Sequence, residues 1–394
     1  MTVTNRAPIE AQVVNQSSPV QRHGGEVDAA EMVMAAQAAH QNGNPERAAA
    51  LYRIALDNLS GPARYPALLG LASAECDSGL FNAAERACRQ AIAEMPDLHI
   101  GHTLLASVLL DLGRADDAAE AIYASLQRAP GDLSLLNLAA GIALRRGRPD
   151  EARKLTEASL AIMPTNQRAV AHLAIAFAQL GVDQAVARLL DFDRLLKVTT
   201  IAPPPGFVSA TDFNRAVTES LVNRSDLSLR HIARTMIGGA RLEDTFALDA
   251  HVANPLRQMF VNAALDYAAK LSVDVNHPVA LGRPAAFTIM SWSNIMESAA
   301  YELPHIHEKA WISGVYYPEV VIDRPLADDA GAIEFGGHDF GDALSTLGPT
   351  RQVMPQSGTL VMFPSYFYHR TIPFEGNGRR ISIAFDIKAV QSGR

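Results

Sequence analysis

The chain has 394 residues, of which 34 are Lys or Arg and 42 are Asp or Glu, so its formal net charge is −8. This length exceeds that of one ordinary domain and predicts two, each with its own core. Basic residues cluster on no helical face, which argues against nucleic acid as a partner. No stretch reaches the roughly 18 consecutive apolar residues of a membrane-spanning helix, and residues 1–27 lack the apolar core of a signal peptide. We therefore expect a cytoplasmic protein with no membrane partner.

Glycine, alanine and proline recur with a period of 34 residues in the first half of the chain. The positions are Gly79, Gly113, Gly147 and Gly181; Ala84, Ala118 and Ala152; and Pro96, Pro130 and Pro164. Gly suits a left-handed helix end and Pro cannot continue a helix, so the pattern predicts paired helices. Period and landmarks together resemble the tetratricopeptide repeat. The resemblance implies a repeat superhelix over residues 28–198, after a disordered tail at 1–27.

Helix pairs of this kind stack into a superhelix whose concave face often binds peptides. Two roles stay open for the array: it binds a peptide or protein, or it mediates self-association and supports the second domain. A homo-oligomer is one expected state of the protein. The only two cysteines, Cys76 and Cys88, fall inside the helical pattern, and we predict that they are packing residues rather than a disulfide or metal ligands.

The second half of the chain changes character at residues 201–206, IAPPPG, because three successive prolines cannot extend a helix. We predict a Pro-rich linker at 199–208 and a second domain at 209–394. Residues 254–271 have an amphipathic helical pattern, and short β-rich runs follow Pro284. These runs are 286–291, 311–317, 332–335, 359–363, 369–372 and 381–387. The predicted fold class is therefore α+β, an α-solenoid followed by a double-stranded β-helix (jelly roll) with supporting helices.

Three histidines and an arginine carry the chemistry of this second domain. His305 and His307 are two positions apart, so in an extended chain both imidazoles point to one side and can reach one metal ion. His369 follows a later apolar run, and facing strands of a jelly roll can bring it to that pair. Arg380 comes eleven residues after His369, with Ser382 facing the same way. A guanidinium presents paired donors that match a carboxylate.

The order of these residues resembles a family of 2-oxoglutarate/Fe(II) oxygenases related to the prolyl 4-hydroxylases. The matching blocks are Trp292-x-Asn294, HIHEKAWISGVYY at 305–317, PQSGTLVMFPS at 355–365 with His369, and RISIAF at 380–385. The resemblance implies that His305 and His369 are iron ligands and that Arg380 binds the far carboxylate of 2-oxoglutarate. Ser382 and Tyr317 would assist Arg380 there. The implied cofactor is Fe(II), with 2-oxoglutarate and O2 as co-substrates.

The chain departs from the family's pattern at His307, where a His-x-Asp/Glu motif has a carboxylate. Three interpretations stay open. His307 ligates in a three-histidine site, or it lies behind a two-histidine site, or a carboxylate such as Asp339 or Glu308 enters from elsewhere. We favour ligation by His307, because H-x-H has the same-side geometry that H-x-D uses. His338 is interpreted as a loop residue.

A three-histidine site also invites comparison with cupin dioxygenases, which need no 2-oxoglutarate. The H-x-H motif here lacks a glutamate four residues later, and Val361 stands where a cupin has its second-motif histidine. Arg380 and Ser382 favour a keto acid instead. A jelly roll without activity, attached to a repeat adaptor, is the other alternative, with the missing carboxylate ligand as its signature.

The resemblance implies a dioxygenase that hydroxylates an unactivated C–H bond and converts 2-oxoglutarate to succinate. The expected substrate is an amino-acid residue in a peptide or protein, which the repeats would present, or a free amino acid. Trp292, Asn294, Trp311 and Arg379 are predicted substrate contacts, although the aromatic residues also suit a barrel core. Asn294 is the stronger candidate, because an inward amide on a strand needs a partner.

Overall fold

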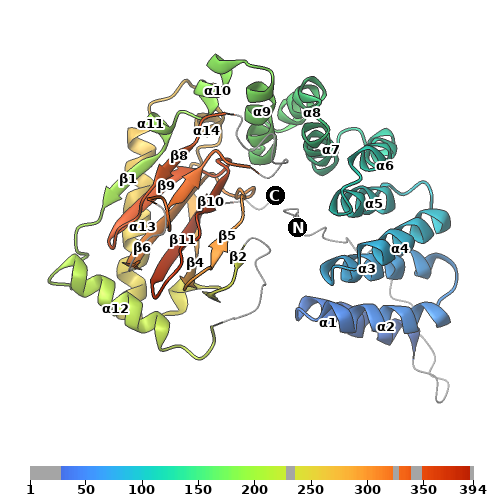
Figure 1. Cartoon of the computed structure of the whole chain (residues 1–394), viewed down its shortest axis with the longest axis horizontal. Helices are drawn as coiled ribbons and strands as arrows, with labels where there is room; N and C mark the ends of the chain where they lie inside the picture. The colour runs from blue at the N-terminus through green and yellow to red at the C-terminus, as the bar shows by residue number, and fades with distance from the viewer. Residues whose placement is uncertain (1–27, 228–235, 323–327, 339–347, 391–394) are drawn as a thin grey trace. The chain divides into compact units, whose positions relative to one another are not determined.

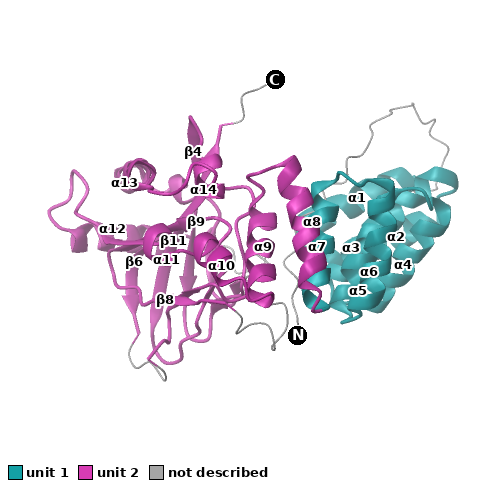
Figure 2. Ribbon diagram, turned by 90° about the horizontal axis from the view of Figure 1, so that it is seen from above, with its two compact units in different colours: residues 1–146 teal, residues 147–394 magenta. Residues whose placement is uncertain are grey.

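The computed structural model describes residues 28–227, 236–322, 328–338 and 348–390. The chain divides into two compact units, residues 1–146 and 147–394, which Figure 2 colours separately, and each is described by itself. The tail predicted at 1–27 lies outside the described residues. Among the helices of the described ranges, none is both long and apolar enough to cross a membrane.

The described part of the first unit consists of helices that follow one another as antiparallel pairs (Figure 1). They are α1 (Ala29–Gln41), α2 (Pro45–Asn58), the short 3-10 turn η1 (Gly61–Ala63), α3 (Arg64–Asp77), α4 (Phe81–Glu94), α5 (His99–Asp111), α6 (Ala115–Arg128) and α7 (Leu133–Arg145). Gly79 and Gly113 end the first helix of their pairs with a φ of 75° each, a left-handed conformation that favours glycine. The helical pairs predicted by the 34-residue period are confirmed.

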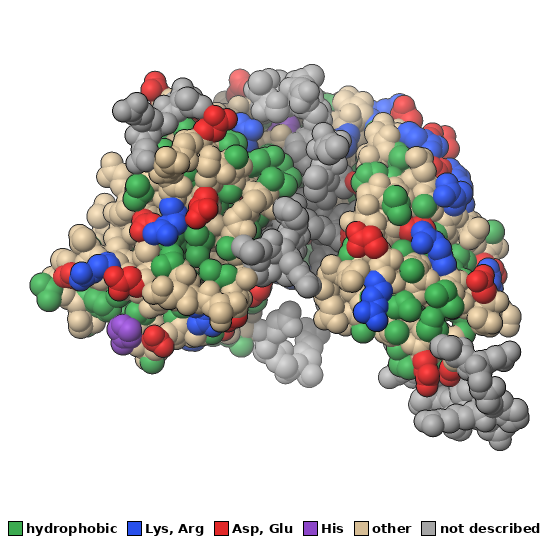
Figure 3. Space-filling model, turned by 60° about the horizontal axis from the view of Figure 1, so that its bottom comes forward, with side chains coloured by type: hydrophobic (Ala, Val, Ile, Leu, Met, Phe, Trp, Pro, Cys, Tyr) green, Lys and Arg blue, Asp and Glu red, His purple; other side chains and the backbone are tan. Residues whose placement is uncertain are grey.

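Small side chains let these helices approach closely. Ala84 and Ala118, the alanine landmarks of two repeats, have no exposed surface. Cys76 and Cys88 are buried and form no disulfide, as expected of packing residues. On the surface, ion pairs link successive repeats; Arg114 bonds Glu85 at 2.8 Å. Figure 3 shows Lys and Arg side chains interspersed with Asp and Glu on the face of these helices that it presents.

The second unit begins with helices that the 34-residue pattern assigned to the repeats. They are α8 (Pro149–Ile162), α9 (Gln167–Gln179), α10 (Asp183–Leu189) and α11 (Phe192–Leu195). The compact unit therefore begins at Gly147, whereas the sequence predicted a domain boundary at 198/199. Tertiary contacts are the reason: Tyr366 donates its hydroxyl hydrogen to the carbonyl of Leu189 at 2.6 Å, and Tyr267 does the same to Leu195 at 2.7 Å. A repeat pattern reports local structure, not which neighbour a helix packs against.

Two antiparallel sheets form the centre of the second unit (Figure 1). The larger has the order β1 (Lys197–Thr200), β9 (Thr359–Pro364), β6 (Ile312–Val321), β11 (Arg379–Ala389), β4 (Phe287–Met296), β3 (Ala240–Leu242). The smaller has the order β10 (His369–Thr371), β7 (Ile333–Phe335), β8 (Arg351–Val353), and a two-stranded ribbon joins β2 (Met236–Ile237) to β5 (Tyr301–Glu302). All six predicted β runs are strands, and the predicted helix at 254–271 is the larger part of α13 (Ala250–Lys270). The α+β class with a helical repeat region before a β-rich region is confirmed.

The predicted linker at 199–208 begins in the larger sheet and then turns, because Phe207 donates its backbone N–H to the carbonyl of Pro204 at 3.2 Å. Thr199 and Thr200 belong to β1 and pair with Leu360 and Thr359 of β9. The prolines follow, and helix α12 (Ala210–Val222) comes next. Thus the first two residues of the predicted linker are held in the sheet by pairing with β9. Composition alone had predicted a linker for the whole segment.

The two faces of the larger sheet differ in what they contact. On the outer face, Phe385 of β11 stacks on Phe260 of α13 with ring centroids 4.0 Å apart. On the inner face, Phe363 of β9 packs against Phe335 of β7 and His369 of β10, at 4.8 and 4.7 Å. The remaining short helices, η2 (Thr245–Ala247) and α14 (Pro278–Leu281), precede β4. The inner face therefore opposes the smaller sheet, and this is where the predicted site residues lie.

Candidate metal centre

His305, His307 and His369 converge, and one ring nitrogen of each lies within 4.8 Å of the others. The backbone builds this arrangement, because His305 and His369 form an antiparallel bridge with two N–H···O bonds of 3.0 Å. His307 donates its backbone N–H to Ser365 at 3.0 Å, which fixes the chain between the two ligand positions. The three imidazoles can hold a metal ion, and the same-side geometry predicted for the H-x-H pair is present, with ring centroids 5.3 Å apart.

Hydrogen bonds determine which nitrogen of each ring is available. His305 Nδ1 lies 2.7 Å from the carbonyl oxygen of Leu303, and His369 Nδ1 lies 3.0 Å from that of Phe367. A carbonyl oxygen only accepts, so each Nδ1 carries the proton and each Nε2 keeps its lone pair. Both rings thus present Nε2 as the metal-binding atom.

The third ring is held by a carboxylate. His307 Nδ1 lies 2.5 Å from Oδ1 of Asp386, so this nitrogen also donates and Nε2 is again left for a metal. Ser313 donates to the same carboxylate oxygen at 2.8 Å. A ligating histidine that gives its second N–H to a carboxylate is a recurrent arrangement in metal sites.

Burial adjusts the protonation of the cluster. It lowers the pKa of His305, and it lowers the pKa of His369 well below the usual value, with neighbouring histidines adding to the effect. Burial raises the pKa of Asp386, but the charge of His307 and the hydrogen bonds from His307 and Ser313 outweigh it, so the net shift is downward. The lowered pKa values favour neutral rings at His305 and His369 and an ionised carboxylate at Asp386, and neutral imidazoles are the form that binds a metal.

Arg380 lies on the same inward face of β11 as Asp386 and is 1% exposed. Its guanidinium donates to Gly331 O at 2.9 Å and to Thr371 Oγ1 at 2.8 Å. Its Nε is buried and makes no hydrogen bond, and among the described residues no carboxylate lies within ion-pair distance of it. A buried cation without an acidic partner is costly. The buried guanidinium of Arg380 therefore suits an anion as its partner.

Tyr317, Ser382 and Asn294 surround this cation. The guanidinium lies 5.7 Å from the centre of the Tyr317 ring, and burial raises the pKa of Tyr317 to about 12 despite the opposing effect of Arg380. Ser382 and Asn294 are directly paired across β11 and β4, so both side chains share the inward face. Asn294 donates to Glu302 at 3.2 Å, while its buried Oδ1 has no hydrogen bond.

The predicted substrate contacts divide into two groups. Trp292 joins the cluster: its ring centre lies 5.4 Å from that of His307, and Arg241 stacks over it at 5.1 Å. Trp311 does not, because its indole N–H bonds Val279 at 2.7 Å and the ring packs against the α14 segment. Arg379 points away from the inward face, as alternation requires, and bonds Glu319 at 2.5 Å.

Of the two carboxylates that the open interpretations brought in, the structure describes only Glu308. Glu308 forms an ion pair with Arg168 of α9 and does not join the histidine cluster. Asp339 lies outside the described residues. His338 is buried, with its ring 6.4 Å from that of Tyr368, and it is not part of the cluster. Among the described residues, the histidine cluster thus contains no carboxylate as a direct ligand.

The sequence prediction missed Asp386 and Thr371. A signal for Asp386 was present, because positions 380, 382 and 386 share one face of a strand and an acidic residue that faces a core needs a partner. Thr371, which bonds Arg380, follows His369 by two residues on the same face of β10. Neither residue belongs to the motif blocks that carried the resemblance.

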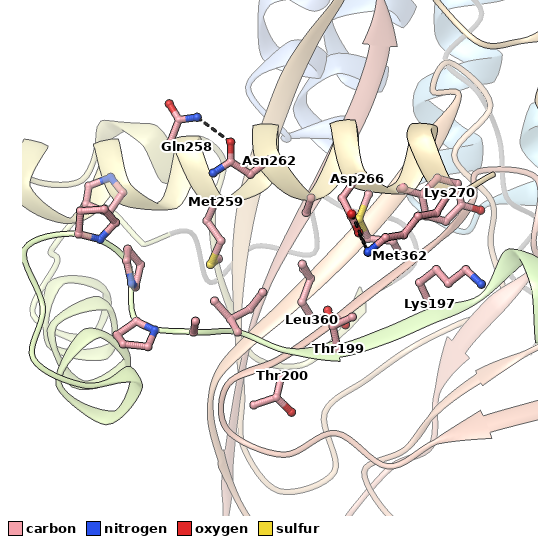
Figure 4. A pocket seen from close by; sticks show the side chains of 18 of the residues that line it. Lys197, Thr199, Thr200, Gln258, Met259, Asn262, Asp266, Lys270, Leu360 and Met362 are labelled. Atoms are coloured by element: carbon pink, nitrogen blue, oxygen red, sulfur yellow. Dashed lines mark hydrogen bonds and ion pairs between the residues drawn. The ribbon is translucent and has the colours of Figure 1, made fainter.

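A large cavity lies elsewhere, on the outer side of the larger sheet. It has a volume of about 830 Å³ and is lined by β1, the Pro-rich segment, α13 and the outward side chains of β9 (Figure 4). Leu360 and Met362 reach it, whereas the next residues along the same strand, Val361 and Phe363, have the opposite facing. The cavity is therefore separated from the metal centre by the sheet.

Comparison with known families identifies both parts of the chain. Residues 290–386 match the family model described as "Putative 2OG-Fe(II) oxygenase", and residues 33–99 and 103–167 match the model described as "Tetratricopeptide repeat". The chain therefore joins tetratricopeptide repeats to a domain of the 2OG-Fe(II) oxygenase family, and both resemblances predicted from the sequence are confirmed. The family implies Fe(II) and 2-oxoglutarate, and the histidine cluster and Arg380 offer ligands of the required kinds.

The solved structures that are similar to this chain include tetratricopeptide-repeat proteins. The MamA protein has 19% identity and a TM-score of 0.37, over 40% of this chain and 86% of its own. YrrB, titled a TPR protein with an unusual peptide-binding site, has 20% identity and a TM-score of 0.37, over 42% and 86%. A repeat protein from Parabacteroides merdae has 14% identity and a TM-score of 0.39, over 64% and 84%. No curated protein matches the chain. At these identities and TM-scores the likenesses carry no argument about ligand or activity.

Proposed function

We propose that the protein is a 2-oxoglutarate- and Fe(II)-dependent dioxygenase that hydroxylates an unactivated C–H bond. The observation that carries the proposal is the pairing of two features on one inward face. One ring nitrogen of each of the three imidazoles lies within 4.8 Å of the others, and their Nδ1 atoms are engaged in hydrogen bonds elsewhere. On the same inward face, the buried guanidinium of Arg380 has no carboxylate partner among the described residues. One feature suits a divalent iron and the other suits the dicarboxylate that the family uses.

In this proposal His305, His307 and His369 hold the metal. When bound, iron with 2-oxoglutarate and O2 supplies the oxidising chemistry, with succinate and carbon dioxide as by-products. The protein positions its own groups for this purpose. Backbone carbonyls fix the tautomers of His305 and His369, and the bridge between their backbones fixes the spacing of the two rings.

Arg380 binds the far carboxylate of 2-oxoglutarate, with Tyr317 and Ser382 beside it. Thr371 and Gly331 accept hydrogen bonds from the guanidinium, whereas its buried Nε makes none within the described protein. The guanidinium of Arg380 presents a fixed fork of donors in a buried site, and the second carboxylate of a dicarboxylate pairs with it. A monocarboxylate has no second carboxylate, so the site distinguishes the two. This requirement separates the proposal from a three-histidine dioxygenase that needs no keto acid.

The substrate in this proposal is an amino-acid residue of a peptide or protein, or a free amino acid. The tetratricopeptide repeats support the peptide form, since such repeats commonly bind extended segments. Trp292 and Asn294 are the proposed substrate contacts, because Trp292 neighbours His307 and Asn294 keeps a buried acceptor without a hydrogen bond. Arg241, stacked on Trp292, is an additional contact that the sequence did not suggest.

A spectroscopic experiment tests the reaction class. Anaerobic addition of Fe(II) and 2-oxoglutarate to the full chain is expected to produce a visible metal-to-ligand charge-transfer band, and admission of oxygen to produce succinate. The substitution Arg380→Met is expected to weaken 2-oxoglutarate binding by about 2–5 kcal/mol, the typical loss when one partner of a buried charge pair is removed. Arg379→Met is the matched control and should leave the band unchanged. If the wild-type chain gives neither band nor succinate, the protein is an inactive repeat adaptor and the proposal fails.

A second experiment addresses the substrate. Proteins and metabolites from cells with the wild-type chain are compared with those from cells with His369→Ala, and hydroxylated products are sought by mass spectrometry. A peptide or amino acid that carries an added oxygen only in the wild-type sample supports the proposed class. Hydroxylation confined to molecules without an amino-acid unit contradicts it.

A further inference from the structure

A chain of buried polar groups lies behind His307 and ends at Asp386. Ser365 and Ser313 are joined at 2.8 Å through their hydroxyls, and Ser313 donates onward to Asp386 Oδ1 at 2.8 Å. His307 Nδ1 donates to the same oxygen at 2.5 Å. The two serines have no exposed surface, and Asp386 is 7% exposed. The elements that contribute these groups are β6, β9 with its following turn, and β11, so three separate parts of the chain meet at one carboxylate.

Protein stability alone does not explain this carboxylate. Among the described residues, no Lys or Arg lies within ion-pair distance of Asp386; His307 lies at 2.5 Å, and Lys388, two residues later, acts on the carboxylate only at longer range. A buried carboxylate without a cation is costly even when hydroxyls bond it. Glu334, a comparably buried acid on β7, does have a cation, because Arg370 bonds it at 2.7 Å. The contrast indicates that the charge of Asp386 acts through His307 and not on a Lys or Arg at ion-pair distance within the described residues.

We propose that Asp386 is a positioning residue of the metal centre and carries the negative charge that a ligating carboxylate supplies in His-x-Asp/Glu sites. It holds the Nδ1–H tautomer of His307 and orients Nε2 toward the metal, and it places one full charge a single imidazole away from the ion. The inference rests on the metal site of the proposed function. It accounts for a histidine at position 307, where a His-x-Asp/Glu site has a carboxylate. In this protein the negative charge belongs to the residue that is hydrogen-bonded to the ligand, not to the ligand itself.

The substitution Asp386→Asn tests this role, because asparagine keeps the size and an acceptor oxygen but removes the charge. The full chain is titrated with Co(II), a spectroscopic substitute for Fe(II), in the absence of 2-oxoglutarate. The expected result is a loss of about 10- to 100-fold in Co(II) affinity, the usual effect of removing a partner of a ligating histidine. Glu334→Gln is the matched control, an isosteric neutralisation of a buried acid outside the cluster, and it should leave the affinity unchanged.

The midpoint potential of the iron-loaded protein provides a readout that a merely structural residue would not affect. Loss of a negative charge near the ion disfavours Fe(III) more than Fe(II), so Asp386→Asn is expected to raise the potential, whereas Glu334→Gln is not. An unchanged affinity and an unchanged potential in Asp386→Asn would overturn the inference.

A measurement on the wild-type chain keeps the inference testable if the variant does not fold. In the Co(II)-loaded protein, a ligating histidine whose Nδ1–H is hydrogen-bonded gives a hyperfine-shifted, exchangeable proton resonance. Three such resonances are expected, from the donors to Leu303, Phe367 and Asp386. Detection of only two resonances would show that His307 does not ligate through Nε2 while its Nδ1–H donates to Asp386. That result would overturn the inference.

The two proposals fail in different ways. If wild-type protein does not bind Co(II) or Fe(II), the proposed metal site fails and the role of Asp386 fails with it. If wild-type protein binds metal and forms the charge-transfer band, while Asp386→Asn matches it in affinity and potential, the role of Asp386 alone fails.

Discussion

The two faces of strand β11 are equally buried but chemically opposite. Outward, Ile381, Ile383, Phe385 and Ile387 have no exposed surface and pack under the helices. Inward, Arg380, Ser382 and Asp386 are 1%, 3% and 7% exposed. Burial of apolar groups stabilises a fold, whereas burial of ionic groups without an opposite charge opposes it. One face thus contributes mainly stability, and the other accepts a cost that binding of ligands can offset.

This comparison separates two kinds of effect that mutation should produce. Changes on the inward face are expected to alter binding of metal or 2-oxoglutarate much more than the free energy of unfolding. Changes on the outward face are expected to do the reverse. A substitution that changed ligand binding and the free energy of unfolding to the same extent would show that the two faces are not independent.

The largest expected effect on binding comes from His369→Ala. The substitution removes one of three Nε2 atoms, so stoichiometric Fe(II) binding should be lost, as measured by anaerobic titration. The free energy of unfolding of the metal-free protein should change by only about 0.5–3 kcal/mol, the ordinary range for a buried substitution. His338→Ala, outside the cluster, is the control. Retention of full-affinity metal binding in His369→Ala would remove this residue from the site.

The largest expected effect on stability comes from Phe385→Ala on the outward face. The ring stacks on Phe260 at 4.0 Å and is fully buried, so its loss should cost about 3–5 kcal/mol of unfolding free energy, measured by chemical denaturation. Metal affinity of the folded protein should stay within a few-fold of wild type. Phe385→Leu, which keeps much of the apolar volume, is expected to cost less. A large loss of metal affinity without destabilisation would contradict the division between the faces.

A smaller loss of stability is expected from Gly314→Ala. A Cβ at Gly314 would lie 2.3 Å from the Phe385 ring, so overpacking should cost about 1–3 kcal/mol. In the Phe385→Ala background the clash is absent and the cost should largely disappear, which a double-mutant cycle measures. Equal costs in both backgrounds would mean that the strain arises from the backbone rather than from the ring.

The smallest expected effect on binding is that of Ser382→Ala. This side chain faces inward two residues from Arg380, and loss of one hydrogen bond to a co-substrate carboxylate should weaken 2-oxoglutarate binding by about 1.5–3 kcal/mol at most. The charge-transfer band at graded 2-oxoglutarate concentrations measures this change. Ser291→Ala, on the outward face of β4, is the control. If Ser382→Ala weakened 2-oxoglutarate binding more than Arg380→Met, it would contradict the proposal that Arg380 contributes more to this binding than Ser382.

Much of the fold and part of the site were predictable from local sequence signals. The glycine and proline spacing predicted the helix pairs, and the six β-rich runs predicted six of the eleven strands described in the second unit. The same-side geometry of His305 and His307 follows from the alternation of an extended chain. The position of Trp311 was not predictable in this way, because the decisive contact comes from Val279, on a short helix 32 residues earlier.

The sequence by itself determined the classes of element, the order of the histidines and arginine, and the absence of a carboxylate at position 307. The tertiary structure decided which residues share a site: Asp386 joined His307 across 79 residues. It also placed helices α8 to α11, which the repeat pattern grouped with the preceding helices, in the β-rich unit. The physical reason is that periodicity is a local property of the backbone. The partner of a buried charge is chosen by three-dimensional proximity, which strand pairing across β6 and β11 provides here.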